Sequence, residues 1–201
     1  MQSVELRAKA KINLSLDVLG KRPDGYHEVK MIMQTIDLCD RILIEKMDKG
    51  IEIECGCPWV PDNSDNIAYK AAQRMIEKYD RVTGVKIKIE KNIPVAAGLA
   101  GGSTDAAAVL KGMNQLFELG LSTEDLMVLG KQIGADVPYC IRGGTMLAEG
   151  IGEKLTELPP LQETVMLLVK PKVGVSTAWV YKNLDLSAIG ARPDTELLIE
   201  A

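Results

Sequence analysis

The chain has 201 residues, of which 46% are hydrophobic and 26% are charged, and its net charge is −4. This balance is typical of a globular protein with one large domain or one domain and part of another. The acidic charge, without any Lys- and Arg-rich run, argues against a nucleic acid as partner. No apolar run approaches the roughly 18 residues of a membrane-spanning helix, so we expect no membrane association. Four scattered cysteines and one histidine make no zinc-ligand set, and we expect reduced thiols in the cytoplasm.

The N-terminal part of the chain alternates between apolar and polar residues. Residues 4–18 are therefore expected to form one or two strands. Lys11 and Asn13 share one face there, because strand side chains repeat every two residues. A solvated polar face is the simpler interpretation of that pair.

A turn is predicted at residues 20–28 (GKRPDGYHE), because Pro, Asp and Gly follow one another. Tyr26 and His27, the single histidine, leave this turn together. A lone histidine is more often structural than functional. Residues 29–47 then predict further strand, with a break at residues 37–40.

Apolar periodicity and capping residues predict the remaining elements. Strands are expected at residues 51–54, 85–91, 145–148, 153–157 and 164–169, and helices at residues 67–79, 106–117, 123–133, 176–183 and 194–201. No internal repeat or low-complexity tract interrupts this pattern.

A loop of small residues separates the strand at residues 85–91 from the following helix. Ser103, Thr104 and Asp105 close the loop, and all three are suitable N-cap residues. The free N–H groups and positive dipole end of a helix suit a phosphate, and glycines let the backbone approach it. The spacing fits neither a Walker A loop nor a dinucleotide fingerprint. A tight turn between packed elements is the alternative interpretation.

Asp136 lies in the stretch GADVPYC, at a helix end and among apolar neighbours. A carboxylate in such surroundings needs partners or a chemical role. An ordinary helix-terminal aspartate is the alternative.

The loop at residues 94–104 resembles the ATP-binding motif of the GHMP kinases, the group of galactokinase and of homoserine, mevalonate and phosphomevalonate kinases. Four further stretches resemble one family within that group, the 4-diphosphocytidyl-2-C-methyl-D-erythritol kinases. These stretches are AKINL (10–14), RPDGYH (22–27), GADVPYC (134–140), and KP (170–171) with GVST (174–177). The similarity runs in order along the whole chain.

This resemblance implies a transferase that uses ATP to phosphorylate a hydroxyl of 4-diphosphocytidyl-2-C-methyl-D-erythritol, giving the 2-phosphate, in the non-mevalonate (MEP) route to isoprenoid precursors. It implies that Asp136 is the general base and contacts substrate, that Lys11 is its catalytic partner and that Asn13 lies near the substrate. Tyr26 and His27 match the cytosine-binding pair. The implied ATP-binding residues are Pro94, Val95, Ala96, Ala97, Gly98, Leu99, Ala100, Gly101, Gly102, Ser103 and Thr104. Mg²⁺ is expected with ATP, held by no dedicated ligand cage, and Ser103 is a candidate contact.

The implied fold is α+β, the GHMP-kinase fold. Residues 1–160 would form the N-terminal ATP- and substrate-binding domain, with a left-handed β-α-β crossover of the ribosomal-protein type. Residues 161–201 would begin a ferredoxin-like C-terminal domain. Members of the family continue for roughly another third of a chain, so we expect a truncated monomer or homodimer with an exposed apolar face.

Three other functions stay open at this point. The chain could be another small-molecule kinase of the GHMP group, although the pair Tyr26–His27 argues against it. It could bind nucleotide without turnover, because of the missing segment. A ribosomal-protein-like nucleic-acid binder would share the crossover, but the acidic charge opposes it.

Overall fold

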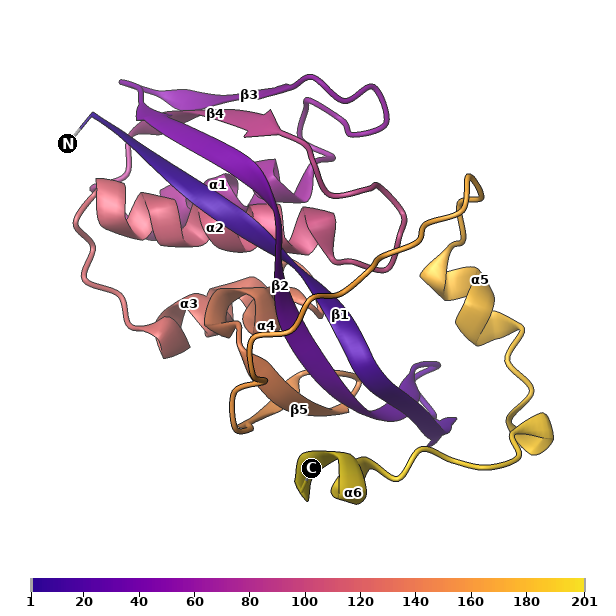
Figure 1. The fold of residues 1–201 in the computed structure, drawn as a ribbon. Coiled ribbons are helices and arrows are strands. Elements are labelled where there is room, and N and C mark those ends of the chain that lie inside the picture. Colours follow the sequence, from indigo (N-terminus) through magenta and orange to yellow (C-terminus); the bar gives the residue numbers. More distant parts are fainter. Residues whose placement is uncertain (1, 201) are drawn as a thin grey trace.

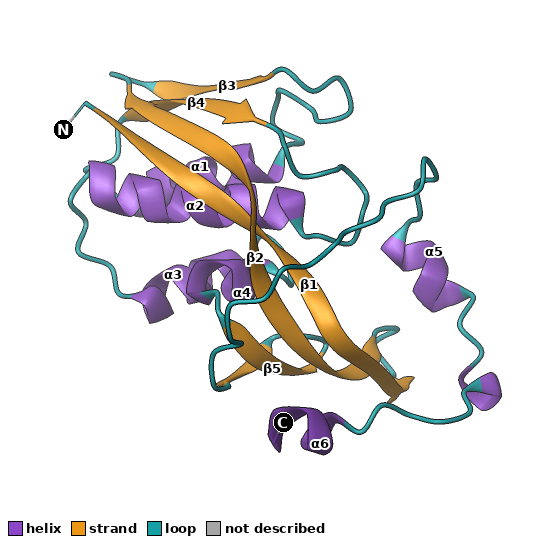
Figure 2. Ribbon diagram, in the orientation of Figure 1, coloured by secondary structure: helices purple, strands orange, loops and turns teal. Residues whose placement is uncertain are grey.

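The computed structural model describes residues 2–200, so Met1 and Ala201, at the outer ends of the two expected domains, lie outside it. The strands are β1 (Ser3–Lys21), β2 (His27–Lys46), β3 (Gly50–Cys55), β4 (Gly84–Glu90), β5 (Thr145–Gly150) and β6 (Lys154–Glu157). The helices are α1 (Ile67–Lys78), α2 (Gly101–Leu116), α3 (Thr123–Lys131), α4 (Val137–Arg142), α5 (Thr177–Lys182) and α6 (Thr195–Glu200), with the 3-10 helix η1 (Leu186–Ala188). One mixed sheet with helices against it confirms the α+β class (Figures 1 and 2).

The long antiparallel hairpin of β1 and β2 runs through the middle of the molecule (Figure 1). The sheet order is β3-β4-β2-β5-β6, and β1 pairs with β2 outside this path. Residues 41–46 of β2 pair with β4 and residues 29–34 pair with β5, so β4 and β5 adjoin successive parts of one strand. β3 and β4 are parallel and are connected through α1, which is the expected β-α-β unit.

The predicted break at residues 37–40 is wrong, because β2 continues through them. Instead, the irregularities are register shifts against β1, one of which lies between Lys9 and Lys11. A bulge of this kind lets a strand bend without ending. The turn between the strands is as predicted: the N–H of Arg22 donates to the carbonyl of Tyr26 at 2.8 Å.

The main core lies where α1 and α2 pack against the sheet (Figure 1). Ile42, Ile44 and Ile87 of the sheet and Leu110 and Met113 of α2 are completely buried there. These residues come from the alternating and the three- and four-spaced positions that predicted the elements. The core therefore fixes α2, and with it the glycine loop that precedes the helix.

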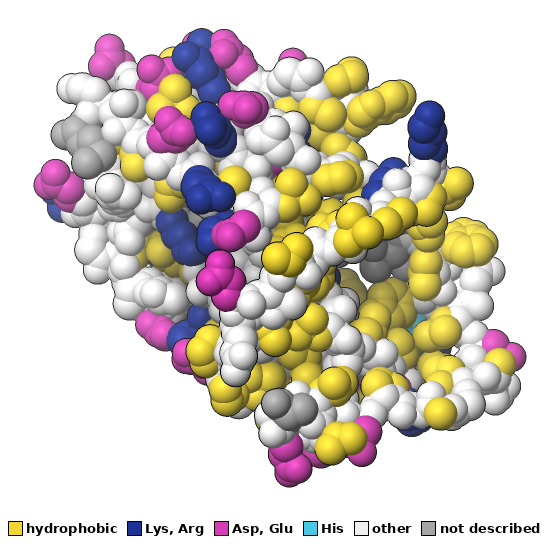
Figure 3. All heavy atoms as spheres, viewed as in Figure 1, with side chains coloured by type: hydrophobic (Ala, Val, Ile, Leu, Met, Phe, Trp, Pro, Cys, Tyr) yellow, Lys and Arg dark blue, Asp and Glu magenta, His cyan; other side chains and the backbone are white. Residues whose placement is uncertain are grey.

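Residues 161–176 follow a different course from the one predicted. A strand was expected at 164–169, but these residues are in extended chain without a sheet partner among the described residues (Figure 2). Isolated strands leave their backbone groups unpaired, so a strand does not form here. Val165 is fully exposed and Leu167 is 89% exposed. Hydrophobic side chains gather along this segment and around the hollow beside it, as expected for an exposed apolar face (Figure 3).

Among residues 2–200, no helix combines the length and apolar character needed to cross a bilayer. The four cysteines are all free thiols, as expected.

Gly112 marks the closest approach of α2 to the hairpin. A Cβ atom there would lie 2.5 Å from Cδ1 of Ile44 and 2.6 Å from Cδ1 of Leu6. We expect Gly112→Ala to lower the free energy of unfolding by about 1 kcal/mol, because overpacking outweighs the better helix propensity of alanine. Urea denaturation followed by circular dichroism measures this, with Gln115→Ala on the exposed face of α2 as the control. A stabilised Gly112→Ala variant would contradict the packing described here.

Candidate functional site

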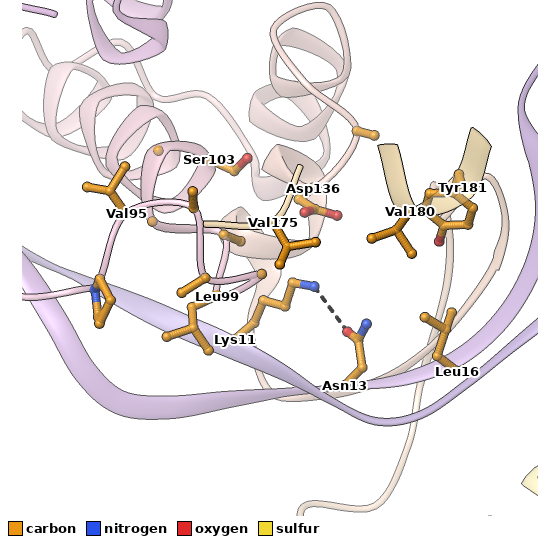
Figure 4. A pocket seen from close by; sticks show the side chains of 18 of the residues that line it. Lys11, Asn13, Leu16, Val95, Leu99, Ser103, Asp136, Val175, Val180 and Tyr181 are labelled. Atoms are coloured by element: carbon orange, nitrogen blue, oxygen red, sulfur yellow. Dashed lines mark hydrogen bonds between the residues drawn. The ribbon is translucent and has the colours of Figure 1, made fainter. Parts of the chain in front are cut away.

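A cleft of about 1750 Å³ opens between the glycine loop, the β1–β2 hairpin, the start of α4 and the C-terminal segment. Each of the residues expected in the site lines this cleft, with the exception of Thr104. Residues far apart in the sequence, such as Lys11, Ser103 and Asp136, thus share one space (Figure 4).

The glycine loop has an unusual backbone. Ala96, Gly98 and Ala100 alternate at positive φ, with angles of 53°, 72° and 57°. Left-handed backbone costs a non-glycine residue roughly 1–2 kcal/mol, and such strain is found where function requires the conformation. Alternation of this kind orients successive N–H groups towards an anion.

Helix α2 begins at Gly101, earlier than predicted from the N-cap types at residues 103–105. Its N-cap residue is Ala100, and no side chain caps it. Ser103 therefore lies within the first turn instead of before it. The first N–H groups of the helix have no side-chain acceptor, so they suit an anion in the cleft.

Two hydrogen bonds fasten the loop and helix to β1. The backbone N–H of Lys11 donates to the carbonyl of Leu99 at 3.1 Å. The Thr104 hydroxyl donates to the carbonyl of Lys9 at 2.7 Å. The register of β1 against β2 shifts between Lys9 and Lys11. At this shift the Lys9 carbonyl and the Lys11 N–H bind α2 and the loop. Thr104 thus positions α2 and does not face the cleft.

A buried charge cluster lies behind the loop. The Lys91 ammonium group is 2.5 Å from Oδ2 of Asp40 and 2.8 Å from Oδ2 of Asp105. Oδ1 of Asp40 accepts the backbone N–H groups of Asn92 and Ile93, at 2.6 and 2.8 Å. The cluster joins β2, the end of β4 and the first turns of α2, so it fixes both ends of the loop.

The charges in this cluster do not balance. Burial raises the pKa of Asp105 to about 8; Lys91 opposes this shift, and the negative charge of Asp40 adds to it. Burial disfavours the charge on Lys91, but the two aspartates outweigh this and raise its pKa. Oδ1 of Asp105 is buried and has no hydrogen-bond partner among the described residues. A protonated Asp105 would leave the cluster neutral.

Lys11 and Asp136 reach the cleft from different elements (Figure 4). The Lys11 ammonium group, on β1, donates to Oδ1 of Asn13 at 3.1 Å, and Lys11 is only 7% exposed. Asp136 is the N-cap residue of α4, but its carboxylate makes no capping bond. Burial and the charge of Asp136 raise the pKa of the Cys140 thiol to about 12, while Lys11 lowers it.

The start of α4 is anchored by Tyr139, which is 1% exposed. Its hydroxyl donates to the carbonyl of Gly144 at 2.8 Å and lies 3.0 Å from the Thr35 hydroxyl. The Thr35 oxygen in turn accepts the N–H of Gly144 at 3.0 Å. This network ties α4 to β2 and so fixes the position of Asp136.

The hairpin turn places Tyr26 and His27 at the other end of the cleft. Tyr26 is 59% exposed. The His27 ring stacks on Tyr181 of α5, with ring centroids 5.1 Å apart and planes at 29°. Stacking at this spacing covers the facing sides of the two rings, so a planar ligand would meet their outer faces and edges.

The sequence interpretation missed several residues that line the cleft, namely Trp59, Lys91, Asp105 and Tyr181. Asp105 carried a usable signal, since it is a charged residue on an otherwise apolar helix face. Tyr181 carried none, because an aromatic residue on an amphipathic helix usually packs in a core.

No group of three or more potential metal-ligating side chains occurs among residues 2–200. Mg²⁺ in phosphoryl-transfer sites commonly takes one or two protein oxygens and completes its shell with substrate phosphates and water. The Ser103 hydroxyl and the Asp136 carboxylate are oxygen donors lining the same cleft. The residues present therefore fit a nucleotide-bound Mg²⁺.

Comparison with known proteins identifies relatives along the whole chain. The family model for the GHMP kinases N terminal domain matches residues 66–144. The chain is 66% identical, over all its 201 residues and 71% of the relative, to 4-diphosphocytidyl-2-C-methyl-D-erythritol kinase of Acetivibrio thermocellus. It is 56% identical to the protein of that name from Clostridium botulinum, over 98% of this chain and 70% of the relative.

Solved structures show the same architecture. A crystal structure of 4-(cytidine 5'-diphospho)-2C-methyl-D-erythritol kinase superposes with a TM-score of 0.80 at 34% identity, over 98% of this chain and 70% of that one. Homoserine kinase from Cytophaga hutchinsonii gives a TM-score of 0.64 at 20% identity, over 93% of this chain and 62% of that one. The second likeness concerns the fold alone.

The charge cluster predicts a pH dependence of stability. The pKa of Asp105 is raised from 3.8 to about 8 in the folded chain, so the folded state binds this proton more tightly. The contribution of the protonated Asp105 carboxyl to the stability of the fold is fully present below pH 3.8 and is lost as the pH rises through about 8. We expect Asp105→Asn to remove this loss. The melting temperature of the variant minus that of the parent should therefore increase between pH 5 and pH 9.

Thermal denaturation at a series of pH values measures the difference. Asp37→Asn is the matched control, because Asp37 is an exposed aspartate paired with Lys9 and its pKa is lowered. Above pH 6, the melting temperature of Asp37→Asn should differ from that of the parent by a constant amount. A constant difference for Asp105→Asn as well would contradict the raised pKa.

Proposed function

We propose that this chain, which belongs to the 4-diphosphocytidyl-2-C-methyl-D-erythritol kinase family, transfers the γ-phosphoryl group of ATP to a hydroxyl of 4-diphosphocytidyl-2-C-methyl-D-erythritol in the non-mevalonate route to isoprenoid precursors. The product is the 2-phosphate. The observation that carries this proposal is that the glycine loop, Lys11, Asp136 and His27 line one continuous cleft.

The glycine loop would hold the phosphates of ATP. Its left-handed residues and the uncapped start of α2 present backbone N–H groups to the cleft. Such groups, together with the helix dipole, bind phosphate without a lysine of the Walker type. The charge cluster behind the loop keeps these groups in place before the nucleotide arrives, which lowers the ordering cost of binding.

Asp136 would act as the general base. Phosphoryl transfer depends mostly on positioning and on stabilisation of charge. A carboxylate free of capping bonds can accept the proton of the substrate hydroxyl as the new bond to phosphorus forms. Lys11 would stabilise the carboxylate and the charge that develops on the transferred group. The bond from Lys11 to Asn13 orients the ammonium group for this role.

The cytidine end of the substrate would lie at the hairpin turn. An imidazole such as that of His27 has two ring nitrogens, and in the neutral form one donates and the other accepts a hydrogen bond, which suits the edge of a pyrimidine. Tyr26 and Tyr181 would supply flat faces for the ring. The hairpin turn and the glycine loop both line this cleft of about 1750 Å³, which would take a nucleoside triphosphate and a nucleotide-linked polyol together.

Mg²⁺ would be bound with ATP, and the Ser103 hydroxyl, which lines the cleft, is the candidate protein contact. When bound, the ion neutralises phosphate charge and helps to align the γ-phosphoryl group. Asp136 remains the group that accepts the proton.

Other GHMP kinases are the second possibility, since homoserine kinase shares the fold. The pyrimidine end of the cleft, with His27 and the tyrosines, is the observation against it. A substrate without a cytidine group would leave that end empty.

A coupled ADP-release assay with the cytidine-linked substrate tests the proposed activity. We expect substrate-dependent ADP release, and Asp136→Asn should reduce turnover by at least about a hundredfold while ATP affinity stays within about twofold. Asp65→Asn, which alters another carboxylate that lines the cleft, is the matched control. Turnover retained in Asp136→Asn would remove Asp136 from the mechanism. ATP binding without substrate-dependent turnover in the parent would favour a nucleotide-binding role instead.

The pyrimidine end has its own test. His27→Ala should weaken binding of the cytidine-linked substrate about tenfold or more, because a buried polar edge loses its partner. Calorimetric titration with that substrate and, separately, with ATP measures both affinities. Equal losses for the two ligands would show that His27 has a structural role only.

A further inference from the structure

The segment from α5 to α6 closes one wall of the cleft and ends in ion pairs with the hairpin. We propose that Arg192 is a positioning residue for the pyrimidine end of the site: through its ion pair with Asp17 it holds this segment, and with it Tyr181, against His27. This inference rests on the proposed function, because it concerns where the cytidine group binds.

The pair between Arg192 and Asp17 joins the segment to the inner part of β1. Nη1 of Arg192 lies 2.5 Å from Oδ1 of Asp17 and also donates to the carbonyl of Val18 at 3.1 Å. The Asp17 side chain is 10% exposed, whereas that of Arg192 is 43% exposed. Asp17 makes no other side-chain hydrogen bond to the described residues. Loss of the arginine would therefore leave a nearly buried carboxylate without a partner, which is strongly unfavourable.

A second pair lies directly beside the first. Lys30 of β2 is the cross-strand neighbour of Asp17 in the hairpin. Lys30 pairs with Glu196, in the first turn of α6. The hairpin thus presents a negative and a positive charge side by side, and the segment presents a positive and a negative charge four residues apart. Thr195, between them, is 4% exposed, so the contact is close packed.

Apolar packing connects these ion pairs to the cleft. Tyr181, Leu184 and Leu186 pack against the smaller core cluster, which includes Val18 and Val29 of the hairpin. Val18 is thus both the residue whose carbonyl binds Arg192 and part of the surface under Tyr181. The chain between Tyr181 and Arg192 is short, so release of the ion pair frees the packing that holds the ring near His27.

The glycine loop has no part in this arrangement. It is fastened to β1 through Lys9 and Lys11 and to the charge cluster through Lys91. Loosening the segment should therefore weaken binding of the cytidine group and leave ATP binding unchanged. A merely structural role of Arg192 would instead affect both ligands in parallel.

The experiment is a double-mutant cycle of Arg192→Gln and Asp17→Asn. The chain has two tryptophans, and Trp179 of α5 is 63% exposed. For acrylamide quenching alone, the parent and all variants also carry Trp59→Phe, so that the fluorescence reports on Trp179 and the segment. Trp59 lines the cleft, so the titrations use chains that keep it. Calorimetric titrations with cytidine diphosphate and with ATP give the two affinities. Arg74→Gln is the matched control, since it removes an arginine–glutamate pair on α1 that lies outside the cleft.

We expect each single variant to bind cytidine diphosphate about tenfold more weakly, and the double variant to be no weaker than either, because the pair acts as a unit. Quenching of Trp179 should increase in all three, and ATP affinity should stay within about twofold. Arg74→Gln should change none of these.

Additive losses of affinity, or equal losses for both nucleotides, would overturn the positioning role. Unchanged affinity for cytidine diphosphate despite stronger Trp179 quenching would also overturn it, although the ion pair would then still hold the segment. If the parent bound ATP but not cytidine diphosphate, the pyrimidine site of the proposed function would fail, and the positioning role with it. The quenching data would still decide whether Arg192 holds the segment.

Discussion

A lysine buried between two aspartates is the interaction on which the site depends. Lys91 directly follows β4, Asp40 lies in β2 and Asp105 lies in the second turn of α2. The strand, the hairpin and the helix meet here because the three charged groups pair with one another; one of them left unpaired would be costly, since each side chain is at most 7% exposed. The strained glycine loop lies between two of these fixed points, which is how left-handed alanines persist in it.

The long hairpin distributes the remaining chemistry. Its bulge at Lys9 and Lys11 fastens the glycine loop at one end, and its turn presents Tyr26 and His27 at the other. Lys11 stands between them, opposite the start of α4. A single element therefore sets the distance between the glycine loop and the hairpin turn, the two ends of the cleft. The C-terminal segment adds the wall that carries Tyr181.

Local patterns predicted the elements well, and long-range contacts decided the rest. Alternation and capping residues predicted β3, α1 and the capping box of α3, because these signals lie within a few residues. All the residues that the family resemblance named line the cleft, except Thr104, whose hydroxyl binds β1 instead; the resemblance did not name Trp59, Lys91, Asp105 or Tyr181. Pairing between Asp17 and Arg192 joins residues 175 positions apart, and no periodicity encodes it. The strand expected at 164–169 failed for the same reason: strand propensity needs a partner that the sequence pattern alone cannot supply.

The imbalance of the charge cluster bears directly on phosphate binding. Two aspartates and one lysine would place a net negative charge behind the loop that we propose to hold a polyanion, and the cluster and the ligand would repel each other. The raised pKa of Asp105, about 8, removes this conflict, since a protonated carboxyl leaves the cluster neutral near pH 7. An approaching triphosphate favours the proton further, because a nearby negative charge stabilises the neutral acid. The cluster can therefore hold the loop through buried hydrogen bonds and one ion pair without opposing the triphosphate proposed to bind there.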